Sequence, residues 1–186
     1  MKIAAKFEFV SKEQYLKDFE FKEDACEVYS KLKKPHRATA MSAGYDFYSP
    51  FDFHLEPGMT IKIPTGIRAK MPEDYVLMIY PRSGLGFKYR LQLNNTVGVI
   101  DSDYYNALNE GHIMIKITND SNEGKALDIK AGEGFAQGIF MQYGIAPYPM
   151  AQSFLLPNYF NTWLHTKFYC FIKLSNKIIK NLPYPD

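Results

Sequence analysis

Short segments rich in β-branched and aromatic residues dominate the middle of the chain. Sequences that contain glycine, proline or asparagine, such as Pro57-Gly58 and residues 119–124, separate them and have the composition of turns. The pattern predicts strands at residues 54–56, 59–63, 67–71, 75–80, 112–118 and 126–129. Many short strands joined by regular turns are typical of an all-β barrel or sandwich.

The first 34 residues follow a different pattern. Residues 2–10 alternate well enough between polar and apolar types to predict a strand. Residues 11–34 are charged, contain no glycine or proline, and carry apolar side chains at roughly helical spacing, so we expect one or two short helices there. Ser11 followed by Gln14 has the form of a capping box. Nothing in this helical insertion carries chemistry.

The composition is that of one globular domain with a sizeable core: 186 residues with a formal net charge of +2. A charge so close to balance gives no reason to expect a nucleic-acid partner. The two cysteines, Cys26 and Cys170, provide no disulfide framework and lack metal-ligand spacing, which favours a reducing, cytoplasmic compartment. No segment has the apolar length of a signal peptide or a membrane span, so we expect no membrane partner.

Residues 147–186 differ in character from the rest of the chain. They hold four basic residues and one acidic residue, net +3, which leaves 18 basic and 19 acidic residues, net −1, in residues 1–146. No glycine follows Gly144. We therefore interpret residues 1–146 as the globular domain and residues 147–186 as an atypical tail. The tail is either translated from a shifted reading frame or a divergent extension that packs on the domain.

The segment from residue 95 to residue 106, NTVGVIDSDYYN, combines β-branched residues with two carboxylates. If it is extended, Asp101, Asp103 and Tyr105 share one face, because residues two apart on a strand point the same way. Gly98 has no Cβ, so another backbone or a ligand can approach it closely. Taken alone, the segment is better explained as a hairpin with an acidic, solvated turn.

The run Arg82-Ser83-Gly84 places a guanidinium, a hydroxyl and an unhindered amide side by side. Such a set can hold phosphate oxygens, the arginine through its fork of donors and the amides as a cradle. The alternative is a turn with a structural arginine that pairs with Asp46. Lys88 is either a further cation of the site or merely exposed.

Four stretches, in this order, resemble the first four signature motifs of the trimeric dUTP pyrophosphatases (dUTPases). They are SAGYDF at 42–47, PRSGLGFK at 81–88, NTVGVIDSDYYN at 95–106 and GEGFAQG at 132–138. The long turn at residues 106–110 is similar to that of dUTPases from Gram-positive bacteria and their phages. The resemblance implies a jelly-roll-like β-barrel that assembles as a homotrimer, with sites built between subunits.

The resemblance also implies an activity, the Mg²⁺-dependent hydrolysis of dUTP to dUMP and pyrophosphate. Asp101 matches the aspartate that activates the water attacking the α-phosphorus. For Asp103, a hydrogen bond in the hairpin or the subunit interface is as good an explanation as a catalytic role. By resemblance, Arg82, Ser83, Gly84 and Gln137 bind the phosphates, Asn95, Gly98, Ile100 and Tyr104 bind uracil and deoxyribose, and Asp46 and Asp103 support the site or the interface.

The metal needs no cluster of protein ligands, because Mg²⁺ keeps several waters and binds chiefly through substrate phosphates. We assign no ligand role to the four scattered histidines. The expected partners are dUTP and two further copies of the chain.

The glycine-rich fifth motif of the family, which closes over the nucleotide, is missing from the sequence after Gly144. This loss predicts reduced activity and leaves a regulatory, nucleotide-binding protein as the alternative. A dCTP deaminase, which shares the fold, fits the motifs less well.

Overall fold

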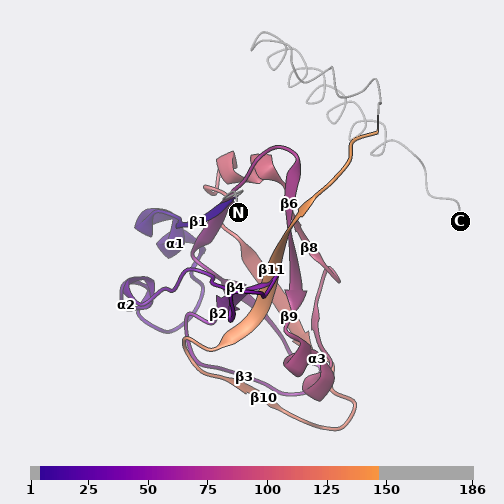
Figure 1. Cartoon of the computed structure of the whole chain (residues 1–186). Coiled ribbons are helices and arrows are strands. Elements are labelled where there is room, and N and C mark those ends of the chain that lie inside the picture. Colours follow the sequence, from indigo (N-terminus) through magenta and orange to yellow (C-terminus); the bar gives the residue numbers. More distant parts are fainter. Residues whose placement is uncertain (1–4, 147–186) are drawn as a thin grey trace, which may run out of the picture. The chain divides into compact units, whose positions relative to one another are not determined.

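A computed structural model of the chain describes residues 5–146. Most of the ordered elements in this range are strands, and the described residues up to Gly144 form one compact unit (Figure 1). The all-β fold class is confirmed. The domain boundary predicted at residue 146 and the interpretation of residues 147–186 as an atypical tail lie outside the described residues.

The strands are distributed over four small antiparallel sheets, with no single closed barrel among the described strands. The sheet orders are β1-β5, β3-β10, β2-β11-β6-β8 and β4-β9-β7. The strands are β1 (Lys6–Phe9), β2 (Tyr45–Tyr48), β3 (Phe53–Leu55), β4 (Thr60–Pro64), β5 (Ile67–Lys70), β6 (Tyr75–Pro81), β7 (Leu91–Leu93), β8 (Gly98–Ile100), β9 (Met114–Asn119), β10 (Leu127–Ile129) and β11 (Gly134–Gln142).

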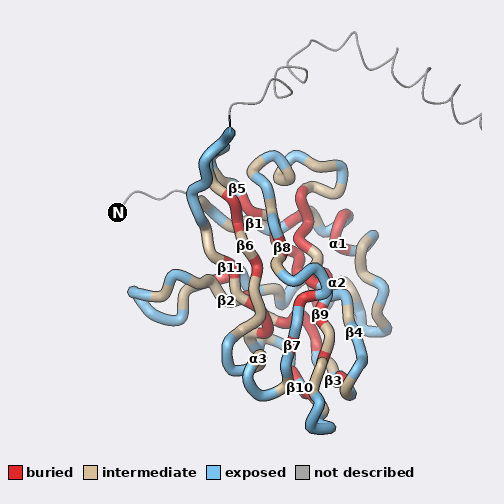
Figure 2. Tube along the Cα trace, turned by 90° about the vertical axis from the view of Figure 1, so that its right-hand side faces the viewer, coloured by how far each residue is buried: buried red, intermediate tan, exposed pale blue. Residues whose placement is uncertain are grey.

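One main hydrophobic core lies between these sheets. Figure 2 shows the buried residues, in red, along the strands. On β6, Leu77 and Ile79 are buried and Met78 between them is only half-buried, as the alternation of side chains on a strand requires. Gly138 of β11 belongs to this packing, since a Cβ there would lie 2.9 Å from Leu77 Cδ1 and 3.0 Å from Phe47 Cε2. The core therefore requires a residue without a side chain at this position.

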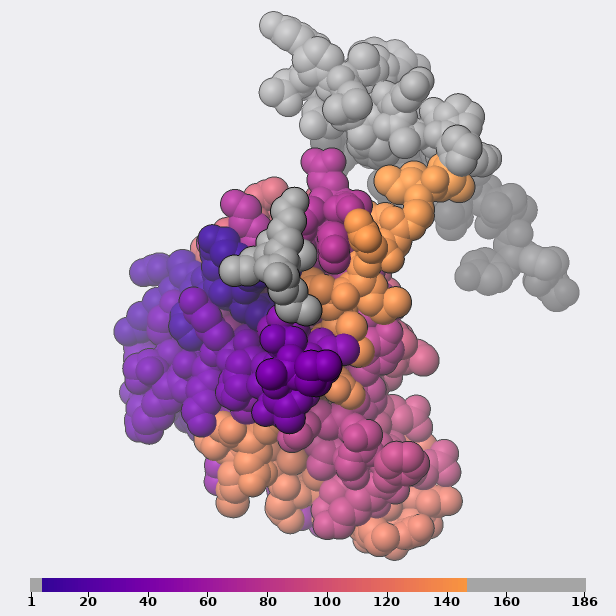
Figure 3. All heavy atoms as spheres, in the orientation of Figure 1, coloured from indigo at the N-terminus to yellow at the C-terminus, as the bar shows by residue number. Residues whose placement is uncertain are grey.

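The N-terminal segment forms the two short helices that its periodicity predicts, α1 (Lys12–Asp18) and α2 (Ala25–Ser30). They enclose a second apolar cluster built on Val10, Tyr15, Val28 and Phe51. In Figure 3 the indigo and violet atoms of this part of the chain cover one side of the molecule. Figure 1 shows α1 and α2 outside the sheets, with β1 hydrogen-bonded to β5.

Only half of the predicted capping box forms. Ser11 Oγ accepts a hydrogen bond from Gln14 N at 3.1 Å, as expected of an N-cap. The return bond from Gln14 is absent, because its amide donates to Asp18 and the Ser11 N–H donates to Glu110 instead. The tertiary contacts of α1 have replaced the local one.

The extended geometry predicted for residues 101–105 is wrong. Asp101 has an extended backbone, but residues Ser102–Asn106 form a 3₁₀ helix, η1, with three residues per turn. Asp103 and Tyr105 therefore do not share a face with Asp101 in the way a strand would impose. The sequence pattern also gave no separate prediction for β2, β7 or β11, although β11 is the longest strand within residues 5–146.

His112 is the fully buried polar side chain that joins α1 to the sheets. Its Nδ1 lies 2.7 Å from Asp18 Oδ2, and the Gly66 N–H donates to its Nε2 at 2.8 Å. Since Nε2 accepts, the proton of the neutral ring is on Nδ1 and is donated to Asp18. Burial lowers the pKa of His112, and the hydrogen bond to Asp18 opposes this shift only in part.

This environment predicts a stability loss in mild acid. In the unfolded chain His112 binds a proton near its ordinary pKa of about 6.5, whereas burial disfavours the proton in the folded chain, so the free energy of unfolding should fall as the pH drops from about 6.5 to 5.5, by at most about 1 kcal/mol. Denaturant unfolding at several pH values measures this slope. His112→Asn should flatten it.

The exposed His54 of β3 provides a control of opposite sign. Hydrogen bonds to Glu56 and Asp128 raise the pKa of His54, so its protonation in acid favours the folded state. His54→Asn should therefore steepen the loss. If His112→Asn leaves the slope unchanged, other groups cause the acid sensitivity.

Candidate active site

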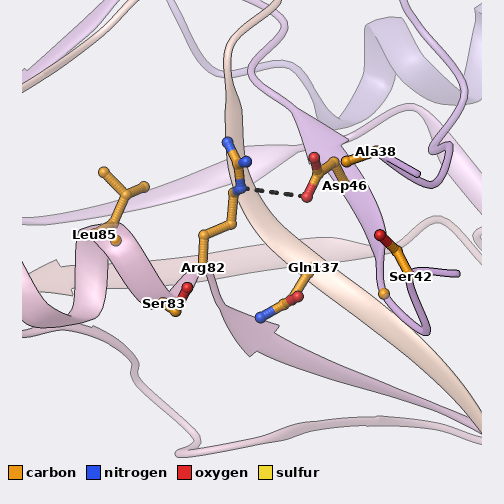
Figure 4. A pocket seen from close by; sticks show the side chains of 9 residues that line it. Ala38, Ser42, Asp46, Arg82, Ser83, Leu85 and Gln137 are labelled. Atoms are coloured by element: carbon orange, nitrogen blue, oxygen red, sulfur yellow. Dashed lines mark ion pairs between the residues drawn. The ribbon is translucent and has the colours of Figure 1, made fainter.

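Strand β11 lies between β2 and β6 and determines which side chains meet on the outer face of this sheet. In the observed register Gln137 pairs with Asp46 of β2 on one side and with Tyr80 of β6 on the other. Arg82 directly follows β6. Three stretches that are far apart in the sequence are thus brought to one place, as Figure 4 shows for Asp46, Arg82 and Gln137.

A cavity of about 350 Å³ opens between these three segments. It is lined by Ala38, Ser42, Gly44, Asp46, Arg82, Ser83, Gly84, Leu85 and Gln137. Five of these residues were predicted as site residues from the sequence. The loop residues Ala38 and Ser42 were not, although their position just before the GYD sequence was a signal that could have found them.

Arg82 is anchored on the wall of this cavity. Its Nε lies 3.2 Å from Asp46 Oδ1, and its Nη1 donates to the Gly134 carbonyl at 3.1 Å. The pairing with Asp46 that was the alternative explanation of Arg82 is therefore observed. These contacts use two of the five N–H donors of a guanidinium, which leaves the side chain capacity for an anion.

Ser83 and Gly84 form the first turn of helix α3 (Ser83–Tyr89), where a turn was predicted. The amides of Leu85 and Gly86 bond back to the Arg82 carbonyl, whereas the first amides of a helix have no acceptor within it. Ser83 and Gly84 are exposed, and no atom lies within 4 Å of the position that a Gly84 Cβ would occupy. A ligand can therefore approach this backbone closely.

Gln137 is held in place by its neighbours. Its Nε2 donates to the Pro81 carbonyl at 3.1 Å. A Cβ on Gly44 would lie only 2.7 Å from Gln137 Oε1, so the glycine makes room for the amide. The amide oxygen of Gln137 consequently faces the segment that carries Ser42 and Gly44, at the edge of the cavity.

The other predicted site residues lie elsewhere on the chain. None of Asn95, Gly98, Ile100, Asp101, Asp103 and Tyr104 lines the cavity. Ile100 pairs with Leu77, which is five residues before Arg82 on an extended strand, a separation of about 17 Å at about 3.4 Å per residue. Within one copy of the chain, Asp101 is therefore well outside hydrogen-bond reach of a group that Arg82 holds.

The turn at residues 93–98 is tight, but it does not connect a pair of hydrogen-bonded strands. β7 pairs with β9 and β8 with β6, so the strands on either side of this turn do not form the hairpin that was one explanation of residues 95–106. Asn95 is exposed, and Thr96 has a positive φ of 64°. Gly98 is buried, and a Cβ there would lie 3.0 Å from Ile79 Cβ, so in this chain its close neighbour is the core.

Tyr104 is fixed through its hydroxyl group. The hydroxyl donates to the His112 carbonyl at 3.1 Å and accepts a hydrogen bond from Asn109 Nδ2 at 2.8 Å. Asp101 and Asp103 are exposed at the start of η1. The sugar-binding candidate is thus rigidly held, while the two carboxylates are accessible.

The outer face of the four-stranded sheet is apolar beside the cavity. Met78 is flanked by Val99 of β8, which is 55% exposed, and by Ile139 of β11. A second hollow of about 500 Å³ adjoins this face and is bordered by Phe87, 92% exposed. Contiguous exposed apolar groups of this kind mark interaction surfaces.

Two further properties concern residues 5–146 alone. No helix in this range is both long and apolar enough to cross a membrane. The same residues contain no group of three or more histidine, cysteine, aspartate or glutamate side chains arranged to hold a metal ion.

The fold and the cavity define a β-protein with a pocket lined by a guanidinium, a hydroxyl and an amide side chain, and Asp101 of the same copy lies outside that pocket. A family model described as dUTPase matches residues 30–155. The chain belongs to the dUTPase family, which confirms the resemblance found in its four motifs.

Individual relatives agree with this assignment. The deoxyuridine 5′-triphosphate nucleotidohydrolase of Lactococcus lactis is 41% identical over 126 residues, which span 64% of this chain and 83% of that protein. The Streptococcus mutans dUTPase structure matches with a TM-score of 0.58 and 34% identity, over 76% of this chain and 98% of that one. The dUTPase of Staphylococcus aureus phage phi11 shares the fold at 21% identity, with a TM-score of 0.57 over 78% and 94% of the two chains.

The anchoring of Arg82 predicts how much the fold depends on it. The Arg82 side chain is 42% exposed, and partly exposed ion pairs contribute about 0–1 kcal/mol. Arg82→Lys should therefore lower the free energy of unfolding by less than about 1 kcal/mol in urea denaturation.

A matched control is Arg90→Lys. Arg90 forms a comparable ion pair, in which its Nη2 lies 3.0 Å from Asp120 Oδ2, and this pair does not line the cavity. The two variants should be destabilised to a similar, small extent. A loss above about 2 kcal/mol for Arg82→Lys alone would mean that Arg82 serves mainly the fold.

Proposed function

We propose that this protein hydrolyses dUTP to dUMP and pyrophosphate. The observation that carries the proposal is the register of β11, which gathers Asp46, Arg82 and Gln137 around one cavity in a chain of the dUTPase family. Relatives with up to 41% identity carry the name deoxyuridine 5′-triphosphate nucleotidohydrolase.

The cavity binds the triphosphate. The unused donors of Arg82 take the phosphate oxygens, and the Asp46 carboxylate and the Gly134 carbonyl keep the guanidinium plane from rotating away. Ser83 adds a hydroxyl, and the open backbone at Gly84 adds an amide. Gln137 offers a neutral amide at the edge of the same cavity, which adds hydrogen bonds without adding charge.

The base and sugar bind to the segment around β8. Uracil presents an acceptor, a donor and an acceptor along one edge, and backbone groups of the turn at Asn95 and Gly98 can match them. Ile100 supplies apolar contact at the end of β8. The ring of Tyr104 stacks beneath the deoxyribose, where it leaves no space for a 2′-hydroxyl.

A complete site requires a second copy of the chain, because Asp101 lies too far along the sheet from Arg82 to share a substrate with it. The apolar outer face around Val99, Met78 and Ile139 is suited to bury against that copy. The assembly implied by the family resemblance is a homotrimer. Each site then takes its phosphate-binding residues from one subunit and Asp101 from another.

Asp101 acts as the general base of the reaction. Its carboxylate orients a water molecule and accepts a proton from it as the water oxygen bonds to the α-phosphorus. The bond between that phosphorus and the α–β bridging oxygen breaks, and pyrophosphate leaves. Arg82 stabilises the charge that develops on the phosphates. Asp103, two residues further on, supports the interface or the position of η1.

Mg²⁺ fits this site as part of the substrate. The donor set of the cavity suits phosphate oxygens, and its one carboxylate, Asp46, is engaged by Arg82. A magnesium ion bound to the triphosphate and water would neutralise phosphate charge without protein ligands.

Asp101→Asn tests the base. The substitution keeps the size of the side chain and its ability to bind water but removes the proton acceptor, so kcat should fall by about 10²–10⁴. Steady-state kinetics with dUTP measures kcat, and a non-hydrolysable dUTP analogue should bind with unchanged affinity.

Asp103→Asn is the control, since the same change two residues away should leave kcat within about threefold of the parent if only Asp101 is the base. Unchanged turnover in Asp101→Asn would refute the assignment. A parent chain that binds dUTP without hydrolysing it would instead support the regulatory alternative.

Mixed assemblies test whether the site is shared. Arg82→Ala and Asp101→Asn should each be inactive as pure assemblies. In random trimers made from equal amounts of the two variants, about one quarter of the interfaces would combine an intact Arg82 with an intact Asp101. The mixture should therefore recover about one quarter of the parent activity.

Val99→Lys in the parent chain provides the matched test of the apolar face. It should yield monomers by light scattering, and these should be inactive even though both Arg82 and Asp101 are present. An active monomer, or no recovery on mixing, would show that one copy forms the whole site.

A further inference from the structure

The N-terminal segment bonds directly to the loop that follows the predicted catalytic aspartate. The dUTPase family model begins at residue 30, so β1 and α1 precede the part of the chain that it describes. Nevertheless three side chains of residues 8–18 reach the loop at residues 104–112: the Tyr105 hydroxyl donates to Glu8, Ser11 donates to Glu110, and Asp18 binds His112.

The Ser11–Glu110 contact holds a strained residue. Both the backbone N–H and the hydroxyl of Ser11 donate to the Glu110 carboxylate, each at 2.7 Å. Glu110 has a φ of +58°, a left-handed conformation that side-chain-bearing residues rarely adopt. Such a conformation persists where its surroundings fix it, and here the start of α1 provides the fixing contact.

The next residue of the loop touches the backbone of η1. A Cβ on Gly111 would lie 2.6 Å from the Tyr104 carbonyl oxygen and 2.8 Å from Tyr105 Cα. The loop and the tyrosine segment are therefore in backbone contact, so a displacement of one displaces the other.

The Asp18–His112 contact continues to the tyrosine itself. Asp18 binds the buried His112 ring on one side and Gly66 binds it on the other, while the His112 carbonyl accepts the hydroxyl of Tyr104. A continuous series of bonds thus runs from α1 to the side chain proposed to bind the sugar.

We propose that the N-terminal segment 6–18 positions Tyr104 and thereby sets the discrimination between deoxyribose and ribose, with Asp18 acting as a positioning residue through His112. The inference rests on the proposed function, because it takes Tyr104 as the sugar-binding residue. Displacements of about 1 Å in such a side chain change reaction rates strongly. The exclusion of a 2′-hydroxyl group by the Tyr104 ring depends on a position of similar precision.

The experiment compares two carboxylates of the N-terminal segment in the full-length chain. Asp18→Ala removes the bond to His112. Asp24→Ala removes the N-cap of α2, which accepts hydrogen bonds from Cys26 N and Glu27 N and makes no bond to residues 104–112. Both variants lose stability, but only the first lies on the path to Tyr104.

The measured quantity is the ratio of kcat/KM for dUTP to that for UTP. Asp18→Ala should lower it at least about tenfold, and Asp24→Ala should leave it within about twofold of the parent. Asp18→Asn keeps an oxygen that can accept from His112 Nδ1 and should retain most of the ratio. Tyr104→Phe should also lower the ratio. The double variant Asp18→Ala/Tyr104→Phe should have the same ratio as Tyr104→Phe alone, because both substitutions break the same series of bonds.

Hydrogen exchange separates the two ways in which the inference can fail. Amide exchange of residues 104–112 should accelerate in Asp18→Ala and stay unchanged in Asp24→Ala. A parent chain that does not prefer dUTP over UTP refutes the proposed function itself. A parent that does prefer dUTP, together with an unchanged ratio in Asp18→Ala or an equal loss in Asp24→Ala, refutes only the positioning role.

Discussion

The antiparallel register of β11 between β2 and β6 is the constraint on which the candidate site depends. A slip of β11 by one residue would turn Gln137 into the core and Phe140, which packs against the core, toward solvent, because successive side chains of a strand alternate in direction. Exposing one apolar side chain of this size costs up to about 1.5–3 kcal/mol, and the close packing at Gly138 would be lost as well. The hydrophobic core therefore fixes the positions of the polar residues on the outer face.

The same sheet separates the proposed phosphate-binding residue Arg82 from the proposed general base Asp101. β6 carries Arg82 beyond its C-terminal end, whereas its partner β8 leads to Asp101 at the opposite end. Antiparallel pairing necessarily sends the continuations of two strands in opposite directions. In the proposed site, Asp101 must therefore come from another copy, and the exposed apolar face beside the cavity is suited to contact that copy.

Much of this could be predicted from the sequence. The strands at 59–63 and 75–80 correspond to β4 and β6 almost residue for residue, because their apolar runs are bounded by clear turn residues. Asp46, Arg82, Ser83, Gly84 and Gln137 were predicted as site residues and meet at one cavity. The motifs carried that information although the segments are far apart in the chain.

What could not be predicted depends on tertiary contacts. The alternation in residues 101–105 suggested a strand, but the 3₁₀ turn of η1 forms there in contact with the loop at Gly111. His112 looked like an unremarkable strand residue, and only the fold reveals that it is buried between Asp18 and Gly66. Ser11 was recognised as a cap, but its bond to Glu110 spans 99 residues, which no local pattern encodes.

The contacts between residues 8–18 and the long turn at 106–111 have an evolutionary consequence. A shortened turn would remove Glu110 and Gly111 and leave the Ser11 donors without their acceptor, and a lost N-terminal helix would leave Glu110 in an unsupported left-handed conformation. Each element makes the other costly to delete. Lineages within the family should consequently have gained or lost the two together, and the length of this turn should indicate whether a given homologue carries the additional helix.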